Sequence, residues 1–407
     1  QARMTLLTDQ FFDSLASSKL DTLEAETLPR ECYASEEFHD FEMEAVFAHE
    51  WLCVGRAEWL EEPGDFFTVS RADEPMIVCK TRDGTIKALS SVCQHRAMLV
   101  AEGHGNTRAF VCPYHHWTYD LDGTLVGAPA MSRTCNFDKK AASLPEIRME
   151  IWHGFIFVNL DPEAEPLTPR LTALEDVVAN YDFASLRGPR PEEPTVFPWN
   201  WKVMLENNND GYHASRLHAG PLHDFIPSGL ATFPEVPADS AGYYRLNGTL
   251  HKNAGFNATQ KSIFPVFPKL TEEEQNRLLF VNLPPSLSLV VLNDSVIYLI
   301  MDPRSANSHA LTIGTLMAPE AMEDPLYDLK VKMTDEAVER IVAQDFHVDE
   351  LVQQGLRSRH APRGRYSWQE GAQRLLNVWL VDRYWAEWDR RRGPSAPVTR
   401  LRAGSSG

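Results

Sequence analysis

The pattern of apolar and polar positions changes character along the 407 residues of the chain. Up to about residue 42 the chain is polar and partly helical, and residues 36–49 repeat apolar side chains at helical spacing. From about 50 to 165 the apolar runs are short and separated by turn residues, which is typical of β-strands. From about 167 onward strands come first and two long helical stretches follow, at 326–356 and 371–391. This order, without βαβ alternation, favours an α+β fold with an antiparallel sheet.

The individual runs predict the main elements. Asp83-Gly84 and Asp122-Gly123 are hairpin turns. Further expected elements are strands at 66–69, 76–79 and 310–317, a strand pair or bent strand at 151–160, a helix at 171–181 and a hairpin at 287–302. The predicted organisation is an N-terminal helical arm (1–42) that packs on the C-terminal domain, a small all-β domain (43–165) and an α+β domain (166–407).

Composition excludes several classes of partner. The formal charge of −18 argues against binding to nucleic acid or to an anionic membrane surface, because both require basic patches. No apolar run approaches the roughly 18 residues of a membrane span, and the N-terminus lacks the basic-then-apolar pattern of a signal peptide. Cys32, Cys53, Cys79 and Cys135 are irregularly spaced, which is typical of free thiols in a reducing compartment. We therefore expect a cytoplasmic protein.

Two short loops carry residues that bind metals. Cys93-Gln94-His95 and Cys112-Pro113-Tyr114-His115 each contain one thiol and one imidazole. A zinc finger usually places two cysteines in one loop and two histidines in the other, so a Cys2His2 zinc site is the less favoured alternative. Mixed loops suit a [2Fe–2S] cluster in which Cys93 and Cys112 bind one iron and His95 and His115 bind the other. Neutral imidazoles raise the reduction potential of such a cluster.

A second group of candidate ligands lies in the C-terminal part. His213 and His218 can bind one metal ion if the helix between them is interrupted or widened, because residues five positions apart otherwise do not share one helical face. One carboxylate would complete a two-histidine, one-carboxylate triad, which binds non-haem iron(II). Asp345, on the predicted helix 326–356, is the best candidate, although Asp335, Asp349 and Glu350 lie nearby.

Both groups of residues resemble those of Rieske non-haem iron oxygenases. The cluster loops, including the run from Cys112 to Gly123, are similar to those of this family. The catalytic subunits match at Asn200-Trp201-Lys202, Glu206-Asn207, Asp210-Gly211-Tyr212-His213 and Gln344-Asp345 followed by Glu350-x-x-Gln353. The resemblance implies a Rieske [2Fe–2S] domain and a catalytic domain of the helix-grip type, in which helices cover a curved antiparallel sheet. It also implies mononuclear iron bound by His213, His218 and Asp345. His116 departs from the family, where Gly or Ala is commoner.

Further roles follow from the resemblance. Asp210 stands three residues before His213, where a carboxylate can accept a hydrogen bond from the imidazole nitrogen that does not bind the metal. In the family the matching acid links this histidine to a cluster histidine of a neighbouring subunit, here His115. That path implies a homotrimer arranged head to tail. Asn207 is a further candidate catalytic residue.

The resemblance implies a terminal oxygenase that uses O2 and a small-molecule substrate. The chain shows no G-x-G-x-x-G motif beside a strand, so its electrons would come from a separate reductase or ferredoxin. Residues 28–33 and 47–51 resemble the branch that oxidises choline, carnitine and betaines, and the whole chain is similar to proline-betaine (stachydrine) demethylases. Oxidative N-demethylation of a quaternary ammonium compound is therefore the leading prediction.

Alternatives remain open at this point. Asp210 stands where quaternary-ammonium members often carry Glu, so an aromatic-ring hydroxylating dioxygenase or monooxygenase is the second interpretation. A pure electron carrier and a zinc-stabilised binding module are two further classes. A cation would be held by aromatic rings, and most aromatic residues of the C-terminal part are expected in the core. Those considered are Phe225, Phe233, Tyr243, Tyr244, Phe256, Phe264 and Phe267.

Overall fold

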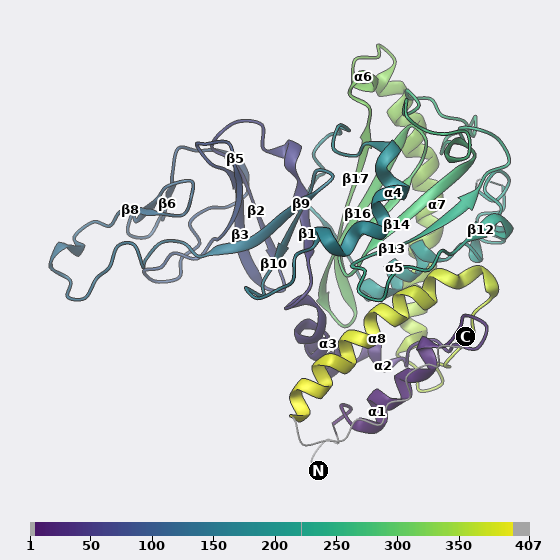
Figure 1. Cartoon of the computed structure of the whole chain (residues 1–407), viewed down its shortest axis with the longest axis horizontal. Coiled ribbons are helices and arrows are strands. Elements are labelled where there is room, and N and C mark those ends of the chain that lie inside the picture. The colour runs from purple at the N-terminus through teal and green to yellow at the C-terminus, as the bar shows by residue number, and fades with distance from the viewer. Residues whose placement is uncertain (1–4, 221, 394–407) are drawn as a thin grey trace. The chain divides into compact units, whose positions relative to one another are not determined.

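The computed structural model describes residues 5–220 and 222–393 and consists of two units (Figure 1). Phe47–Pro166 form one unit. The residues up to Val46 join those from Leu167 onward in the other. Within the described ranges, no helix combines the length and the hydropathy that crossing a lipid bilayer requires.

The unit Phe47–Pro166 is built from antiparallel strands, as the short apolar runs predict. A seven-stranded sheet has the order β1-β10-β9-β4-β3-β2-β5, and a three-stranded sheet has the order β6-β7-β8. The bounds are β1 Leu52–Arg56, β2 Asp65–Arg71, β3 Glu74–Lys80, β4 Ile86–Ser90, β5 His104–Asn106, β6 Phe110–Val111, β7 Thr118–Tyr119, β8 Leu125–Gly127, β9 Glu146–Trp152 and β10 Phe155–Asn159. Both predicted Asp-Gly turns connect paired strands, and 151–160 is a strand pair.

The two predicted cluster loops are anchored in the core of this unit. The first loop lies between β4 and β5, and the second lies between β6 and β7. Cys93 and Cys112 belong to the same buried apolar cluster as Trp117 and Tyr119. Burial of these neighbours fixes the positions of the two thiols relative to each other.

The other unit is α+β, as predicted. Its seven antiparallel strands have the order β11-β17-β16-β15-β14-β13-β12. The bounds are β11 Thr195–Phe197, β12 Ala231–Thr232, β13 Tyr243–Gly248, β14 Arg277–Leu283, β15 Leu287–Val291, β16 Ser295–Ser305 and β17 Ser308–Met317. The central strands β14 and β15 are buried at nearly every position, so both faces of the sheet are covered.

Helices surround this sheet, and α4 and α8 pack on β13 while α5 packs on β16 (Figure 1). The bounds are α1 Asp9–Ser14, α2 Glu31–Ala34, α3 Glu36–Glu42, α4 Thr172–Val178, α5 Trp201–Asn209, α6 Pro319–Met322, α7 Tyr327–Leu356 and α8 Gly371–Arg392. A π-helical turn, Met43–Phe47, extends α3, so the amphipathic segment predicted at 36–49 is helical. The predicted helices at 326–356 and 371–391 correspond to α7 and α8.

The buried stripe of α7 is polar. Its buried residues are Asp345, Asp349 and Gln353, which recur every four positions and therefore share one face. Apolar residues of the same helix, including Val338, are only partly buried. Buried polar groups require partners, so this stripe indicates that α7 serves a site as well as the core.

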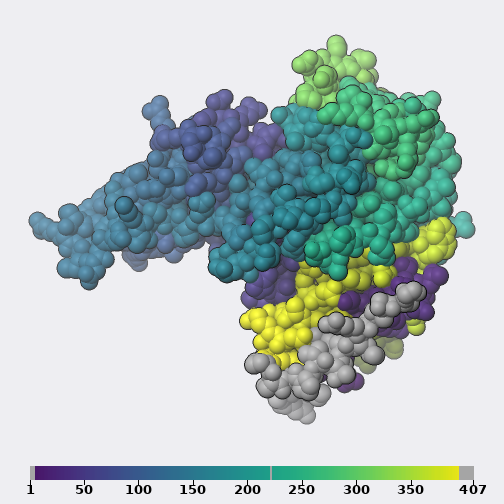
Figure 2. Space-filling view, in the orientation of Figure 1, coloured from purple at the N-terminus to yellow at the C-terminus, as the bar shows by residue number. Residues whose placement is uncertain are grey.

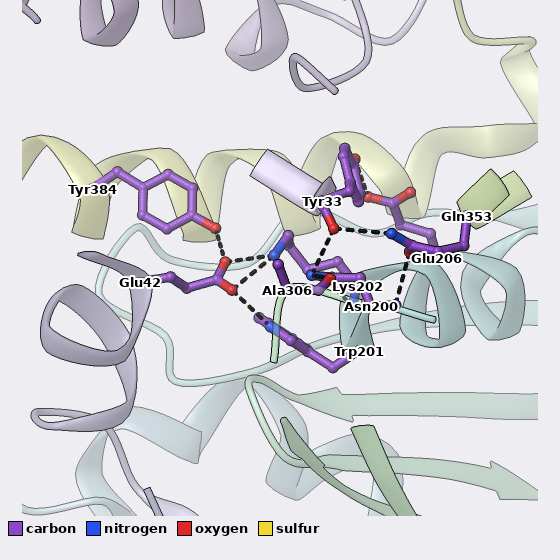
Figure 3. Close-up of polar contacts among 9 residues, drawn as sticks. All are labelled: Tyr33, Glu42, Asn200, Trp201, Lys202, Glu206, Ala306, Gln353 and Tyr384. Atoms are coloured by element: carbon purple, nitrogen blue, oxygen red, sulfur yellow. Dashed lines mark hydrogen bonds and ion pairs between the residues drawn. The ribbon is translucent and has the colours of Figure 1, made fainter. Parts of the chain in front are cut away.

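The N-terminal segment is held against α5 and α8 by a buried polar network (Figure 3). Glu42 accepts hydrogen bonds from Trp201 Nε1 at 2.9 Å, from Lys202 Nζ at 2.7 and 2.8 Å, and from the hydroxyl of Tyr384. The side chains of Glu42 and Lys202 are both fully buried. In the space-filling view the purple N-terminal segment lies against the yellow helix α8 (Figure 2).

Candidate metal centres and active site

The two cluster loops share one backbone conformation. In each loop the cysteine N–H donates to the carbonyl five residues further on at 2.8 Å. The residue four positions on donates to the cysteine carbonyl at 3.0 Å. That residue is Ala97 in the first loop and His116 in the second, and both have a φ near +60°. Glycine adopts this left-handed conformation without steric cost, which explains why a small residue suits the position of His116.

The donor atoms of the four predicted ligands fit a [2Fe–2S] cluster. His95 Nδ1 and His115 Nδ1 face each other at 3.1 Å, so both can bind one iron. The thiols of Cys93 and Cys112 are buried, whereas His95 is exposed. The Tyr119 hydroxyl lies 3.3 Å from Cys93 Sγ, where it can donate to a thiolate. Hydrogen bonds to cluster sulfurs raise the reduction potential.

The second predicted ligand set converges at one point in the other unit. Helix α5 ends at Asn209, and the separate 3-10 turn His213–Ser215 ends before His218. The helix is therefore interrupted between the two histidines, as the spacing required. One ligand atom from each of His213, His218 and Asp345 lies within 4.8 Å of the others. His218 Nε2 is 2.9 Å and His213 Nε2 is 3.4 Å from Asp345 Oδ1.

The opposite nitrogens of both imidazoles have their own acceptors. His213 Nδ1 lies 3.1 Å from Asp210 Oδ2, and His218 Nδ1 lies 2.9 Å from Gln344 Oε1. These contacts leave both Nε2 atoms directed at Asp345, which is the orientation that metal-binding histidines need. Two imidazoles and one carboxylate form the donor set of non-haem iron(II) sites. The residues present therefore fit such an ion.

The charges around this centre shift three pKa values. Burial would lower the pKa of His213, but Asp210 and Asp345 outweigh it and raise the pKa to about 9. Burial would raise the pKa of Asp345, and the two histidines reverse this and hold it below its usual value. Burial and the charge of Asp345 raise the pKa of Asp349 to about 8.

A cavity of about 150 Å³ adjoins the three residues and lies between α7 and the sheet. Its wall is mainly apolar. Drug-sized pockets occupy roughly 300–1,000 Å³, so this cavity suits a smaller molecule. The apolar and aromatic wall residues include Ile297, Leu299, Ile313, Phe256, Phe280 and Phe346.

Several wall residues differ from those singled out in the sequence. Of the seven aromatic residues named in the sequence analysis, Phe256 lines the cavity. Phe280 and Phe346 also line it, although neither is named there. Asn207 lies at the cavity, and its Nδ2 is 3.4 Å from Asp345 Oδ1. Gln344 and Arg245 were given no role in the sequence analysis. The alternation of β13 points to Arg245. Its buried positions include polar residues, whereas the apolar Leu246 lies at a less buried position, which is unusual for a strand that only packs in a core.

Comparison with known protein families agrees with this geometry. The model described as "Rieske [2Fe-2S] domain" matches residues 50–145, and the model described as "Ring hydroxylating alpha subunit (catalytic domain)" matches residues 174–386. The second match covers more than half of the chain. The chain belongs to the Rieske oxygenase alpha-subunit family. A Rieske domain and a catalytic domain of the mononuclear iron type are therefore both present.

Two relatives show where the chain lies within the Rieske oxygenase family. The glycine betaine monooxygenase oxygenase subunit of Chromohalobacter salexigens is 33% identical over 235 residues, which cover 54% of this chain and about half (52%) of that protein. The chloroplastic choline monooxygenase of Arabidopsis thaliana is 28% identical over 366 residues, with 86% of this chain and 81% of that protein covered. The relatives thus include proteins named for quaternary ammonium compounds.

A solved structure supports the fold of this Rieske oxygenase. The structure of a quaternary ammonium Rieske monooxygenase superposes with a TM-score of 0.77 at 22% identity. It covers 94% of this chain and all of that chain. At this identity the likeness establishes the fold, with a curled antiparallel sheet in the catalytic part, as the resemblance in the sequence had implied.

Proposed function

We propose that this chain is the terminal oxygenase of a Rieske system that removes an N-methyl group oxidatively from a small quaternary ammonium compound. One observation carries the proposal. A single chain holds a donor set for a [2Fe–2S] cluster and a converged two-histidine, one-carboxylate set beside a small cavity. In this proposal a Rieske domain at 43–165 holds the cluster, and a catalytic domain at 166–407 holds the mononuclear iron. The N-terminal arm, 1–42, packs on the catalytic domain.

The chemistry balances with two electrons supplied from outside. When bound at His213, His218 and Asp345, iron(II) supplies the site at which O2 is reduced and the substrate is oxidised. One oxygen atom enters an N-methyl C–H bond, and the other leaves as water after taking up two electrons and two protons. The resulting N-hydroxymethyl compound loses formaldehyde and a proton, and the tertiary amine remains. The electrons come from a separate reductase or ferredoxin.

The protein's own residues position the reacting groups. Asp210 and Gln344 hold the two imidazole rings through their Nδ1 atoms. The apolar wall displaces water from the substrate, which strengthens the polar interactions that remain in the cavity.

The electron path is proposed to cross a subunit boundary. In this proposal Asp210 links His213 to His115 of a neighbouring subunit, and three chains form a ring. The 3.1 Å contact between Asp210 Oδ2 and His213 Nδ1 supports the part of the path that lies within one subunit.

The substrate class rests on two observations. Relatives are named for glycine betaine and choline. Phenylalanines also line the cavity, and aromatic rings can attract ammonium groups. Proline betaine is the specific substrate proposed first. Aromatic-ring hydroxylation is the second candidate, because the cavity wall is predominantly apolar and residue 210 is Asp rather than Glu.

Metal analysis tests the cofactors. Purified protein should contain three iron atoms and two labile sulfides per chain and should show the visible absorption of a Rieske cluster. Asp345→Ala should retain two iron atoms and the cluster spectrum. Zinc in a colourless protein would contradict the proposal, and a protein with the cluster alone would be an electron carrier.

Turnover tests the substrate class. With a compatible reductase, O2 uptake and formaldehyde release should be measured for proline betaine, glycine betaine, carnitine, choline, benzene and benzoate. Equal amounts of formaldehyde and consumed O2 with an N-methyl compound support demethylation. A dihydrodiol or phenol from an aromatic compound, with no formaldehyde from any amine, would establish the second candidate instead.

A further inference from the structure

Arg245 places a buried positive charge in the wall of the active-site cavity. It lies on β13, contributes to the cavity, and is 4% exposed. Arginine is rarely buried to this degree unless it is paired.

The protein satisfies this guanidinium only in part. Its Nη2 donates to the carbonyl of Asn208 at 3.4 Å, and its plane lies over the ring of Phe280 at 3.5 Å from the centroid. Its Nε is buried and has no hydrogen-bond partner. Among the described residues, no carboxylate forms an ion pair with Arg245.

The carboxylate whose charge acts on Arg245 is already engaged. Asp210 accepts from the Tyr212 N–H and contacts His213 Nδ1. Burial lowers the pKa of Arg245 to about 10, so the side chain is still positively charged at neutral pH. A buried charge that forms no direct ion pair is costly. An anion in the cavity would remove this cost.

We propose that Arg245 binds the carboxylate of the substrate, so that the natural substrate is a small zwitterion rather than an amino alcohol. This inference rests on the proposed function, because it divides the quaternary ammonium compounds into those with a carboxylate and those without. The guanidinium nitrogens of arginine form a planar fork that matches two carboxylate oxygens. Contact with Phe280 holds the plane of this fork.

Charge balance in the cavity supports the same assignment. The two positive charges of iron(II) bound there would be balanced by the carboxylates of Asp345 and Asp210. The positive charge of Arg245 would then remain unbalanced. A ligand that is only cationic would then be repelled by the wall, whereas a betaine brings a negative charge for Arg245. The carboxylate end at Arg245 would direct the ammonium end toward the rest of the cavity, where His213 and His218 also lie.

Calorimetric titration of the oxidised holoenzyme, without an electron donor, tests the inference by equilibrium binding. Glycine betaine and choline are the matched ligands, because both carry a trimethylammonium group and only the first has a carboxylate. Arg245→Gln should weaken glycine betaine about thirtyfold or more, which is the scale of losing one partner of a buried charge pair. Choline binding should not weaken, because the substitution removes a positive charge that repels choline.

Two further variants serve as controls. Arg277→Gln removes an arginine on the neighbouring strand β14, beside Glu273 and outside the cavity wall, and should leave both ligands unchanged. Arg245→Lys keeps the charge but not the fork, and should weaken glycine betaine severalfold with little effect on choline. If Arg245→Gln loses its iron or its native circular dichroism spectrum, Arg245→Lys replaces it, and its binding of glycine betaine and choline is compared with that of the wild type.

Each result has a definite meaning. Equal losses for glycine betaine and choline, or no loss for either, would overturn the assignment of Arg245. If the wild-type enzyme binds neither of these ammonium compounds nor proline betaine, the proposed function fails, and benzoate and benzene replace them as the matched pair. Selective loss of benzoate in Arg245→Gln would then retain Arg245 as a carboxylate site, and the absence of that selectivity would refute it.

Discussion

Replacement of Lys202 by Met should leave a buried carboxylate without its counter-charge. Lys202 Nζ lies 2.7 and 2.8 Å from the two carboxylate oxygens of Glu42, and both side chains are fully buried (Figure 3). Methionine retains most of the apolar stem of lysine. The substitution therefore tests the electrostatic interaction rather than packing.

The structure sets the size of the effect. Breaking a buried ion pair by removing one partner costs about 3–5 kcal/mol. The cost has a ceiling, because the orphaned carboxyl can take up a proton. A glutamic acid with a pKa of about 4.3 pays about 5 kcal/mol for this at pH 8 and about 1.6 kcal/mol at pH 5.5. Lys202→Met should therefore lose about 3–5 kcal/mol at pH 8 and less than about 2 kcal/mol at pH 5.5.

Urea unfolding followed by tryptophan fluorescence at the two pH values measures this loss. The double variant Lys202→Met/Glu42→Gln removes both charges and should recover to within about 2 kcal/mol of the wild type. Lys332→Met is the control, since Lys332 and Glu336 form an exposed pair at 3.9 Å that should contribute less than about 1 kcal/mol. A pH-independent loss, or a double variant as unstable as the sum of the two single variants, would refute the reasoning.

Three other outcomes are expected. Asp210→Asn should keep both metal sites filled but slow reoxidation of the reduced cluster by O2 and substrate about 100-fold. Mixing these chains with His115→Ala chains should restore some activity, and no rescue in mixed trimers would place the path within one subunit. His116→Gly should raise the thermal stability of the cluster-loaded Rieske unit by about 0.5–1 kcal/mol, because φ at this position is +58°; an unchanged melting temperature of the cluster absorption would contradict this. Burial raises the pKa of Glu206 to about 7, so the unfolded chain loses this proton first as the pH rises. Glu206→Gln should consequently add nothing to the free energy of unfolding below pH 4 and about 3 kcal/mol above pH 7, and a gain that is independent of pH would exclude this cause.

The sequence alone determined the features that depend on neighbouring residues. Apolar periodicity and Asp-Gly turns located the strands of the Rieske unit and the long helices α7 and α8, because these elements form through local hydrogen bonds and local burial. The spacing of cysteine and histidine in two loops also predicted two mixed ligand pairs. Both loops indeed adopt one conformation, with a left-handed residue four positions after each cysteine.

The meeting of distant residues was decided by tertiary structure. Asp345 reaches His218 across 127 positions because α7 packs with a polar stripe toward α5 and the sheet. The sequence named Asp345 as the best candidate, but it could not show that this acid, rather than Asp335, Asp349 or Glu350, faces the two histidines. The direction of a helical face depends on what the helix packs against. The same reason explains Arg245. The sequence pattern predicted no strand at its position. The pairing of β13 with β14 makes Arg245 part of the cavity wall and leaves its Nε without a hydrogen-bond partner.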